Sequence, residues 1–159
     1  MSLWVADTSS LIFLAHLDRL DLLRREAGDV LVPPAVMHEL RAKPDAASEK
    51  IDALDWLTIV SPRDRKVLEV LRLDLDAGEA EAIALAYERS ADRTLMDDLA
   101  GRRFARRLGL PLIGTVGLLL AARLRGEIPS LSEEIDRLRD AGFFVGEALV
   151  AQVLKAAGE

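Results

Sequence analysis

The sequence predicts a three-layer α/β/α fold, in which a central, mostly parallel sheet is flanked by helices on both faces. Two observations predict it. Short apolar runs typical of buried strands alternate along the whole chain with longer segments whose apolar side chains recur at helical spacing. No low-complexity linker or internal repeat interrupts this alternation, and 159 residues suit one core, so we expect residues 1–159 to form a single domain.

Five segments are expected to form strands, because each is a short apolar run that ends at a proline, a glycine or the start of a helix. These segments are residues 3–6, 30–32, 56–60, 94–96 and 111–113. The third is a strand or an extended connection. Strands separated by helices of this length imply parallel pairing with right-handed connections.

In the first half of the chain, a helix is predicted over residues 9–23, where apolar side chains keep helical spacing. Pro33 and Pro34 end the second strand and open a helix that carries Glu39, since proline is tolerated in the first turn of a helix. A polar loop over residues 43–49 then passes into another helix.

In the second half, residues 76–79 have the capping-box pattern and lead into an alanine-rich, buried helix over residues 80–89. A C-terminal helix is expected to close the chain. The other helices of this half are predicted at residues 63–71, 99–108, 115–125 and 131–140.

The composition suits a globular cytoplasmic protein. Half of the residues are hydrophobic and 30% are charged, and the absence of cysteine excludes disulfides, thiolate metal sites and cysteine nucleophiles. The first seven residues lack the basic region of a signal peptide. The longest uncharged window, residues 108–122, is too short to span a membrane, so we expect no membrane association.

Carboxylates follow the predicted strands, either directly or in the next helix. They are Asp7, Glu39, Glu79 and the adjacent pair Asp97 and Asp98. Because the carboxyl ends of parallel strands meet at one edge of a sheet, we expect these acids to share a pocket. Mg²⁺ and Mn²⁺ prefer such oxygen ligands, and one or two of these ions can activate a water for phosphodiester hydrolysis.

The net charge of −6 argues against a general nucleic-acid binder, but these five acids account for most of it. Each acid also has a structural explanation. Asp7 could cap a helix, and Glu39 could pair with Lys43. Glu79 could complete the capping box, and Asp98 could cap the next helix.

Four motifs make the sequence resemble PIN-domain nucleases, including the VapC-type toxins of toxin–antitoxin pairs. Residues 5–12 are similar to the opening of these nucleases, and residues 32–40 to their second motif, a strand, a proline and a helix carrying an acid. Residues 78–86 resemble the third motif, and residues 95–103 the fourth. The tail, from Gly109 to Phe143, is similar to a widespread prokaryotic subfamily of VapC-like proteins.

The resemblance implies a PIN-like fold and a Mg²⁺- or Mn²⁺-dependent endoribonuclease that cuts single-stranded RNA. It also implies the toxin role of a type II toxin–antitoxin pair, with a small antitoxin protein as partner and a homodimeric state. The acidic quartet would be Asp7, Glu39, Glu79 and Asp97 or Asp98, acting both as catalytic residues and as metal ligands.

Three assignments stay open in the sequence. The third acid is expected to be Glu79, with Glu81 as a nearby competitor, and only side-chain direction can decide between Asp97 and Asp98. Thr8 or Ser9 would support the site by holding a metal-bound water or the backbone near Asp7, with helix capping as the alternative role.

Arginines on the predicted helix after Asp98 are the candidate substrate contacts. Arg102, Arg103, Arg106 and Arg107 form one basic stripe, and we expect the first three to bind phosphates. The alternative is a solvated face or an antitoxin-docking surface. Aromatic residues make up only 4% of the chain, so extensive base stacking is not expected.

Two other enzyme classes are disfavoured by the residues after the first strand. A haloacid-dehalogenase-like phosphatase needs an aspartate two residues after the first, where this chain has Ser9. A dinucleotide-binding protein needs a glycine-rich turn, and residues 7–10 contain no glycine. A PIN-fold module that binds nucleic acid or protein without nuclease activity stays as the alternative function.

Overall fold

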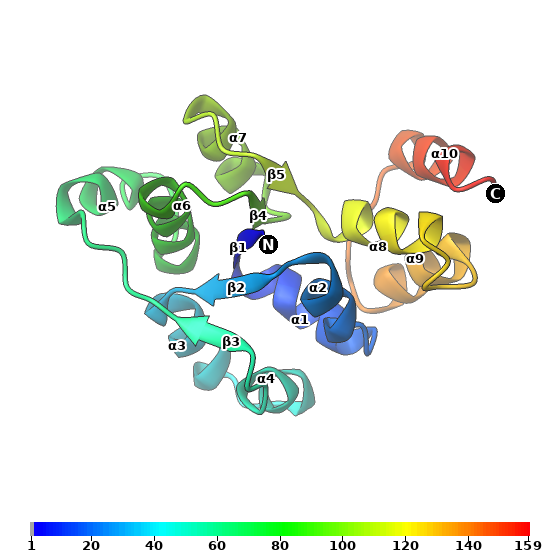
Figure 1. Cartoon of the computed structure of the whole chain (residues 1–159), viewed down its shortest axis with the longest axis horizontal. Coiled ribbons are helices and arrows are strands. Elements are labelled where there is room, and N and C mark those ends of the chain that lie inside the picture. Colours follow the sequence, from blue (N-terminus) through cyan, green and yellow to red (C-terminus); the bar gives the residue numbers. More distant parts are fainter. Residues whose placement is uncertain (1) are drawn as a thin grey trace.

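The centre of the protein is a parallel sheet with the strand order β3-β2-β1-β4-β5. The computed structural model describes residues 2–159, and within them this sheet is accompanied by ten helices (Figure 1). The strands are β1 (Leu3–Ala6), β2 (Asp29–Val32), β3 (Leu57–Ile59), β4 (Arg93–Leu95) and β5 (Leu112–Ile113). The predicted three-layer α/β/α fold is confirmed, and all four strand pairings are parallel.

The helices occupy the segments between and after the strands. They are α1 (Thr8–His16), α2 (Leu20–Glu26), α3 (Pro34–Ala42), α4 (Ala46–Asp52), α5 (Arg65–Leu71), α6 (Ala77–Arg89), α7 (Leu99–Arg107), α8 (Thr115–Leu124), α9 (Leu131–Asp140) and α10 (Glu147–Ala156). Of these, α5, α7, α8 and α9 begin and end within two residues of the predicted bounds. The helix α6 begins three residues earlier than predicted, and α4 begins at Ala46, inside the predicted loop. Within residues 2–159, no helix is long and apolar enough to cross a membrane.

The single helix predicted over residues 9–23 is wrong, because the structure divides this segment into α1 and α2. Asp18 adopts a φ of 56°, in the left-handed region, which ends a right-handed helix. The carbonyl of Leu17 accepts a 2.8 Å hydrogen bond from Arg137 instead of continuing the helix. The apolar spacing misled the prediction because both helices bury their apolar faces.

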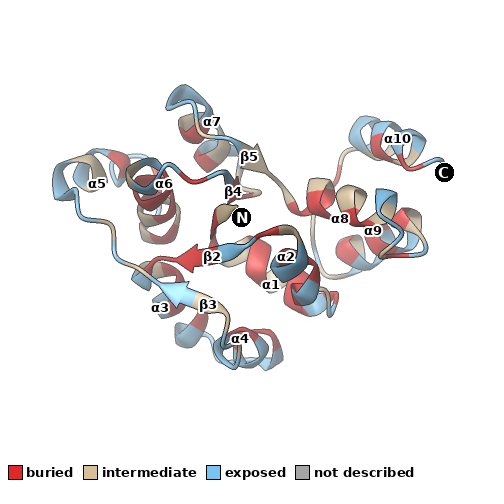
Figure 2. Cartoon of the chain, viewed as in Figure 1, coloured by how far each residue is buried: buried red, intermediate tan, exposed pale blue. Residues whose placement is uncertain are grey.

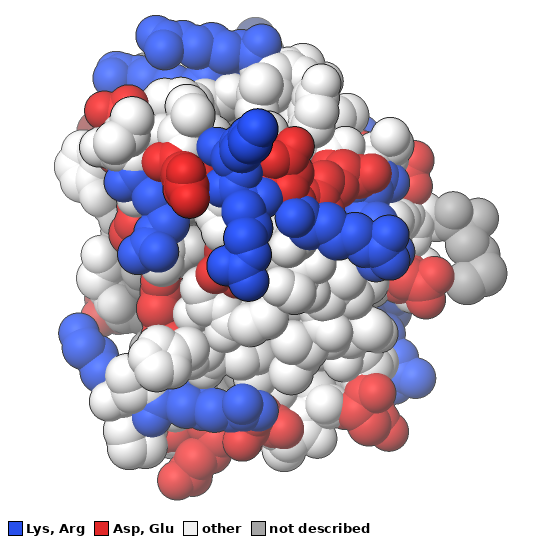
Figure 3. Space-filling model, turned by 90° about the vertical axis from the view of Figure 1, so that its left-hand side faces the viewer, with Lys and Arg blue, Asp and Glu red and all other residues white. Residues whose placement is uncertain are grey.

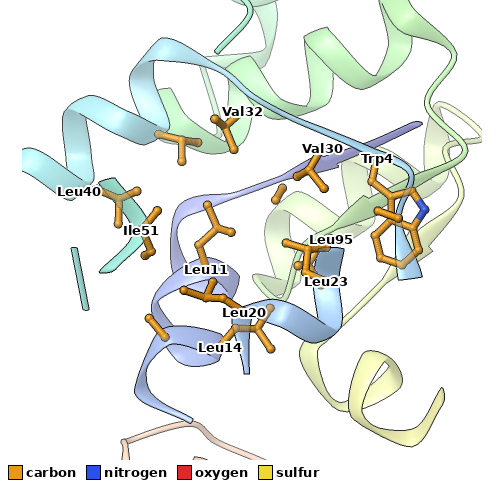
Figure 4. Packing of buried hydrophobic residues seen from close by; sticks show 14 of the residues in the cluster. Trp4, Leu11, Leu14, Leu20, Leu23, Val30, Val32, Leu40, Ile51 and Leu95 are labelled. Carbon is orange, nitrogen blue, oxygen red and sulfur yellow. The ribbon is translucent and has the colours of Figure 1, made fainter. Parts of the chain in front are cut away.

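The sheet separates two cores, and the alternation of side chains along β1 shows how. Trp4 and Ala6 face a core formed with α1 to α4, whereas Val5 faces a core formed mainly with α6. Figure 4 shows the first core, in which Trp4 and Leu95 from neighbouring strands lie over leucines of α1 and α2. Buried residues are concentrated in α1, α6 and α8, while α5 and α10 are largely exposed (Figure 2).

A third apolar cluster joins α8, α9 and α10 to the turn between α1 and α2. Its polar anchor is Glu134, which is 3% exposed and receives a 2.7 Å hydrogen bond from Arg19. Arg137 also contacts the same carboxylate. Buried leucines and the Arg19–Glu134 ion pair therefore hold the C-terminal helices against the rest of the fold.

The order of the strands creates a switch point between β1 and β4. The chain proceeds from β1 outward to β2 and β3, then returns to the other side of β1 as β4, and ends with β5. In open parallel sheets, ligands bind beyond the carboxyl ends of the strands at such a point. The N–H of Asp7 still pairs with the carbonyl of Leu95 at 3.1 Å, so the residues after β1 and β4 are held together.

Candidate active site

Asp7 is the most buried of the predicted site residues, with 2% of its surface exposed at the carboxyl end of β1. It caps α1, since Oδ1 accepts a 3.2 Å hydrogen bond from the N–H of Ser10. Burial, followed by the charge of Asp97, raises the pKa of Asp7 from its ordinary 3.8 to about 7, against the opposing hydrogen bonds from Ser10. Asp7 thus caps α1, and its burial disfavours the ionised form of its carboxyl group.

Asp97 and Asp98 point in different directions. Oδ1 of Asp97 accepts a 2.8 Å hydrogen bond from the N–H of Thr115, and Oδ2 accepts from the hydroxyls of Thr115 at 2.5 Å and Ser10 at 2.9 Å. Because Ser10 also contacts Asp7, the Asp97 carboxylate is fixed toward that residue. Asp98 instead caps α7 through a 2.9 Å hydrogen bond from the N–H of Gly101.

Glu39 reaches the site from α3 and lies against the first turn of α6. Its Oε1 accepts a 2.9 Å hydrogen bond from the N–H of Gly78, and its Oε2 accepts a 2.6 Å hydrogen bond from the hydroxyl of Thr8. The position favours an anion, because the first N–H groups of a helix lack intrahelical partners. In residues 2–159, the expected ion pair between Glu39 and Lys43 does not form.

Glu79 is half-buried in the first turn of α6, and only half of the predicted capping box forms. Asp76 Oδ1 accepts a 2.8 Å hydrogen bond from the N–H of Glu79, but the Glu79 carboxylate makes no hydrogen bond within the described chain. Burial, then the charges of Asp76 and Asp98, raise the pKa of Glu79 from 4.5 to about 7. Glu81 lies elsewhere, bonded to the N–H of Ala35 at 3.2 Å.

These residues enclose a cavity of about 190 Å³. Its lining contains three of the predicted acids, both predicted supporting residues and two others: Asp7, Glu39, Glu79, Thr8, Ser9, Ile12 and Asp76. Asp97 lies beyond this lining, connected to it through Ser10. The structure therefore places Asp7, Glu39 and Glu79 around one cavity, with Asp97 linked to Asp7 through Ser10. Asp98 caps α7 and acts on Glu79 through its charge, and Glu81 bonds to Ala35.

Sequence reasoning missed four residues that shape the site. Asp76 was expected only as a helix cap. Its position three residues before Glu79 is the one feature of the sequence that could have indicated that it lines the cavity. Ser10 and Thr115 are fully buried and position Asp97. Gly78 carries no side-chain chemistry, and its importance appears only when the distance to Glu39 is known.

The chemistry of the donor set suits a divalent cation. All the donors are carboxylate or hydroxyl oxygens, which hard ions prefer. Burial is the largest cause of the raised pKa values of Asp7 and Glu79, with the charges of neighbouring acids adding to it, and a bound cation would favour the ionised forms. Within residues 2–159, no three acid or histidine side chains converge closely enough to enclose an ion. The residues fit an ion that keeps several of its waters, as Mg²⁺ does.

The arginines of α7 line two hollows on neighbouring flanks of the helix. Arg102 and Arg106 line a groove with Asp97, and the Nη1 of Arg102 donates a 2.8 Å hydrogen bond to the carbonyl of Met96. Arg103 and Arg107 line a different hollow beside α7. Of the three predicted phosphate contacts, Arg102 and Arg106 therefore lie beside the site, while Arg103 lies apart from it.

The surface charge of the molecule is mixed. Figure 3 shows the side on which α5 lies in Figure 1, and there acidic and basic side chains are interleaved instead of forming one broad basic area. The formal net charge is −6. Attraction of an anionic polymer must therefore come from local groups such as the arginines of α7, not from the field of the whole protein.

A comparison with protein-family models finds one that covers the fold and the site together. The family model described as the PIN domain matches residues 3–159, a span that includes all five strands and every candidate residue named above. No curated protein matches the chain.

Proposed function

The chain belongs to the PIN-domain family, and on that premise we propose that it is a metal-dependent endoribonuclease hydrolysing phosphodiester bonds of single-stranded RNA. PIN domains are typically nucleases, so the reaction class follows from the family, while the RNA substrate and the metal are our proposal. The observation that carries it is the pairing of Asp7 with Asp97 across the switch point, where Ser10 bonds both carboxylates.

We propose that Asp7, Glu39, Glu79 and Asp97 hold one or two Mg²⁺ or Mn²⁺ ions, partly through water. A bound divalent ion supplies a Lewis acid that lowers the pKa of a water molecule and offsets charge on the phosphodiester. We assign Asp98 a different role from Asp97, because Asp97 is the one linked to Asp7 through Ser10, whereas Asp98 caps α7 and acts on Glu79 through its charge.

Hydroxyl groups of neighbouring residues hold two of these carboxylates in position for metal binding. Thr115 and Ser10 fix the carboxylate of Asp97, and Thr8 fixes that of Glu39, so these side chains need little reorganisation when substrate binds. Asp7 and Glu79 each have a pKa raised to about 7, so each is partly protonated at neutral pH, and cation binding favours their ionised forms.

The geometry also supports cleavage within a strand. The cavity beside Asp7 continues into a groove of about 400 Å³ that shares Thr8 and Glu39 with it and extends to Lys43. On the side of Asp97 lies another groove of about 530 Å³. A single-stranded polymer can leave the site in two directions, so an internal phosphodiester can reach the acids.

The experiment measures cleavage of a labelled single-stranded RNA by the purified full chain with Mn²⁺ or Mg²⁺. Asp7→Asn and Asp97→Asn are expected to lose about 100-fold or more in rate, while Asp98→Asn, which keeps a cap of similar shape, stays within a few-fold of the wild type. If the wild type neither cleaves RNA nor gains thermal stability in millimolar Mn²⁺, the nuclease proposal is wrong. The alternative of a PIN-fold interaction module would then be favoured.

We further propose that the protein is the toxin of a type II toxin–antitoxin pair, acting as a homodimer that binds a small antitoxin. The similarity of its motifs to VapC-type toxins supports this role. A small gene directly upstream that encodes a DNA-binding protein, and whose product co-purifies with the chain, is the expected observation. Its absence would indicate a solitary nuclease.

A further inference from the structure

A groove of about 530 Å³ opens beside Asp97, away from the acidic cavity. Its lining includes Asp97, Arg102, Arg106, Phe143, Phe144 and Leu149. In Figure 1, α7 and α10 stand on either side of the connection from β5 to α8, which supplies further lining residues. We call it the α7–α10 groove.

One wall of the α7–α10 groove is positively charged. Arg102 and Arg106 lie one helical turn apart on α7, and within residues 2–159 neither forms a salt bridge. Burial, together with the nearby charge of Arg106, lowers the pKa of Arg102. Arg102 donates one hydrogen bond to the carbonyl of Met96 and lies near the charge of Asp97, which opposes this lowering. The donors that are left on the two guanidinium groups suit an anion that contacts both, and a phosphate matches their planar geometry.

The opposite wall presents an aromatic ring. Phe144 is 91% exposed, the largest fraction among the exposed large hydrophobic side chains of the described residues. The backbone that carries the ring is held in place, because the N–H of Phe143 bonds the carbonyl of Leu138 at 2.9 Å and Val145 is buried. The Phe143 ring itself packs edge-on against Phe13, with centroids 4.8 Å apart. Phe144 is therefore the ring available to a ligand.

An exposed aromatic ring in the same groove as two arginines without salt bridges in the described chain is a combination that can bind single-stranded nucleic acid, in which bases stack and phosphates pair with cations. We propose that the α7–α10 groove binds one nucleobase of the RNA on the ring of Phe144, while Arg102 and Arg106 hold the adjoining phosphates. This subsite rests on the proposed function and deepens it, because the groove begins at Asp97. One ring accommodates a single base, which agrees with the low aromatic content of the chain.

The test measures RNA binding in the presence of a chelator, so that its result does not depend on cleavage. The full chain is titrated into a short single-stranded RNA that contains 2-aminopurine, and both anisotropy and base fluorescence are recorded. Phe144→Ala is expected to weaken binding about 5- to 100-fold and to abolish quenching of the 2-aminopurine. Phe144→Leu keeps an apolar side chain but loses the stacking, whereas Phe144→Trp restores both signals. Tyr87→Ala is the control, since Tyr87 is 54% exposed and lies outside the groove.

The arginines are tested by the salt dependence of the same binding. Arg106→Gln should reduce the slope of log affinity against log salt concentration by about 0.7, because one phosphate contact to a single strand is lost. Phe144→Ala should leave that slope unchanged. Arg103→Gln is the matched control, because Arg103 lies on the same helix but lines another hollow.

The subsite proposal is overturned if Phe144→Ala binds RNA within twofold of the wild type, if Tyr87→Ala weakens binding equally, or if the wild type binds no RNA. In the first case the groove would be a surface for a peptide partner. The nuclease proposal is judged separately: stacking on Phe144 without any cleavage in Mn²⁺ would reject the nuclease and retain the subsite.

Discussion

The N–H of Gly78 donates a 2.9 Å hydrogen bond to Oε1 of Glu39, and a Cβ atom at Gly78 would lie 2.7 Å from both oxygens of that carboxylate. Real Cβ atoms essentially never show contacts this short, so only glycine at this position leaves room for the Glu39 carboxylate where it lies. The glycine thereby gives Glu39 a backbone donor at a helix N-terminus.

Gly78→Ala should therefore affect the site more than the fold. Alanine favours the helix by about 1 kcal/mol, and the flexible Glu39 side chain can move aside, so we expect the free energy of unfolding to change little. The displaced carboxylate should lower RNA cleavage roughly 10- to 100-fold. The control is Gly146→Ala, since a Cβ there meets open space. Full activity of Gly78→Ala would show that the position of Glu39 is unimportant.

The stability of the metal-free protein should fall as the pH rises from about 4 to about 7. Asp7 has a pKa of about 7 in the folded state against an ordinary value of 3.8, so in this window the folded state holds a proton that the unfolded state has released. The stabilisation is complete below pH 4 and lost above pH 7, and it amounts to roughly 2–4 kcal/mol.

Urea denaturation at several pH values in EDTA checks this prediction. Asp7→Asn retains the cap of α1 without the charge, so it should be more stable than the wild type at pH 8 and show a flatter pH dependence. Asp21→Asn, which removes the charge of an exposed acid outside the cavity, should keep the wild-type slope. Equal slopes for wild type and Asp7→Asn would mean that Asp7 ionises normally. Millimolar Mn²⁺ should oppose the fall in stability, because binding requires the ionised carboxylate.

Thr94→Val should stabilise the protein by about 1 kcal/mol. Thr94 is fully buried in β4, and its hydroxyl has no hydrogen-bond partner within the described residues. Valine has nearly the same shape and removes the unsatisfied polar group. Thermal denaturation and urea titration measure the gain, with Thr58→Val on the exposed face of β3 as the control expected to stay within about 0.5 kcal/mol. A loss of stability would reveal a partner for the hydroxyl.

Glu134→Ala should destabilise the fold by about 3 kcal/mol, because it leaves Arg19 without the buried carboxylate that binds it at 2.7 Å. Glu134→Gln should have an intermediate effect. The exposed pair of Arg25 and Asp21, at 3.1 Å, is the control, and Asp21→Ala should change the free energy of unfolding by less than about 1 kcal/mol. If both alanine variants behave alike, burial does not strengthen the Arg19–Glu134 contact.

Most of the fold could be predicted because, within each segment, apolar residues recur at the spacing of a strand or of a helix. The alternation of Trp4, Val5 and Ala6 between two cores, and the proline that begins α3, are local features. The break between α1 and α2 could not be predicted. Apolar spacing continues through it, and its cause is a left-handed Asp18 together with a hydrogen bond from Arg137, which lies 120 residues away.

The sequence by itself determined which acids follow which strands, since a carboxylate after a buried strand is visible as a local pattern. Only the tertiary structure decided where the ambiguous side chains point. Asp97 turns toward Asp7 because Thr115, eighteen residues later, donates two hydrogen bonds to it, while Asp98 is occupied by the next helix. The arginines of α7 likewise line two different hollows, because neighbouring flanks of one helix face different elements. The direction of a side chain depends on partners that are distant in sequence, and a local sequence pattern contains no information about those partners.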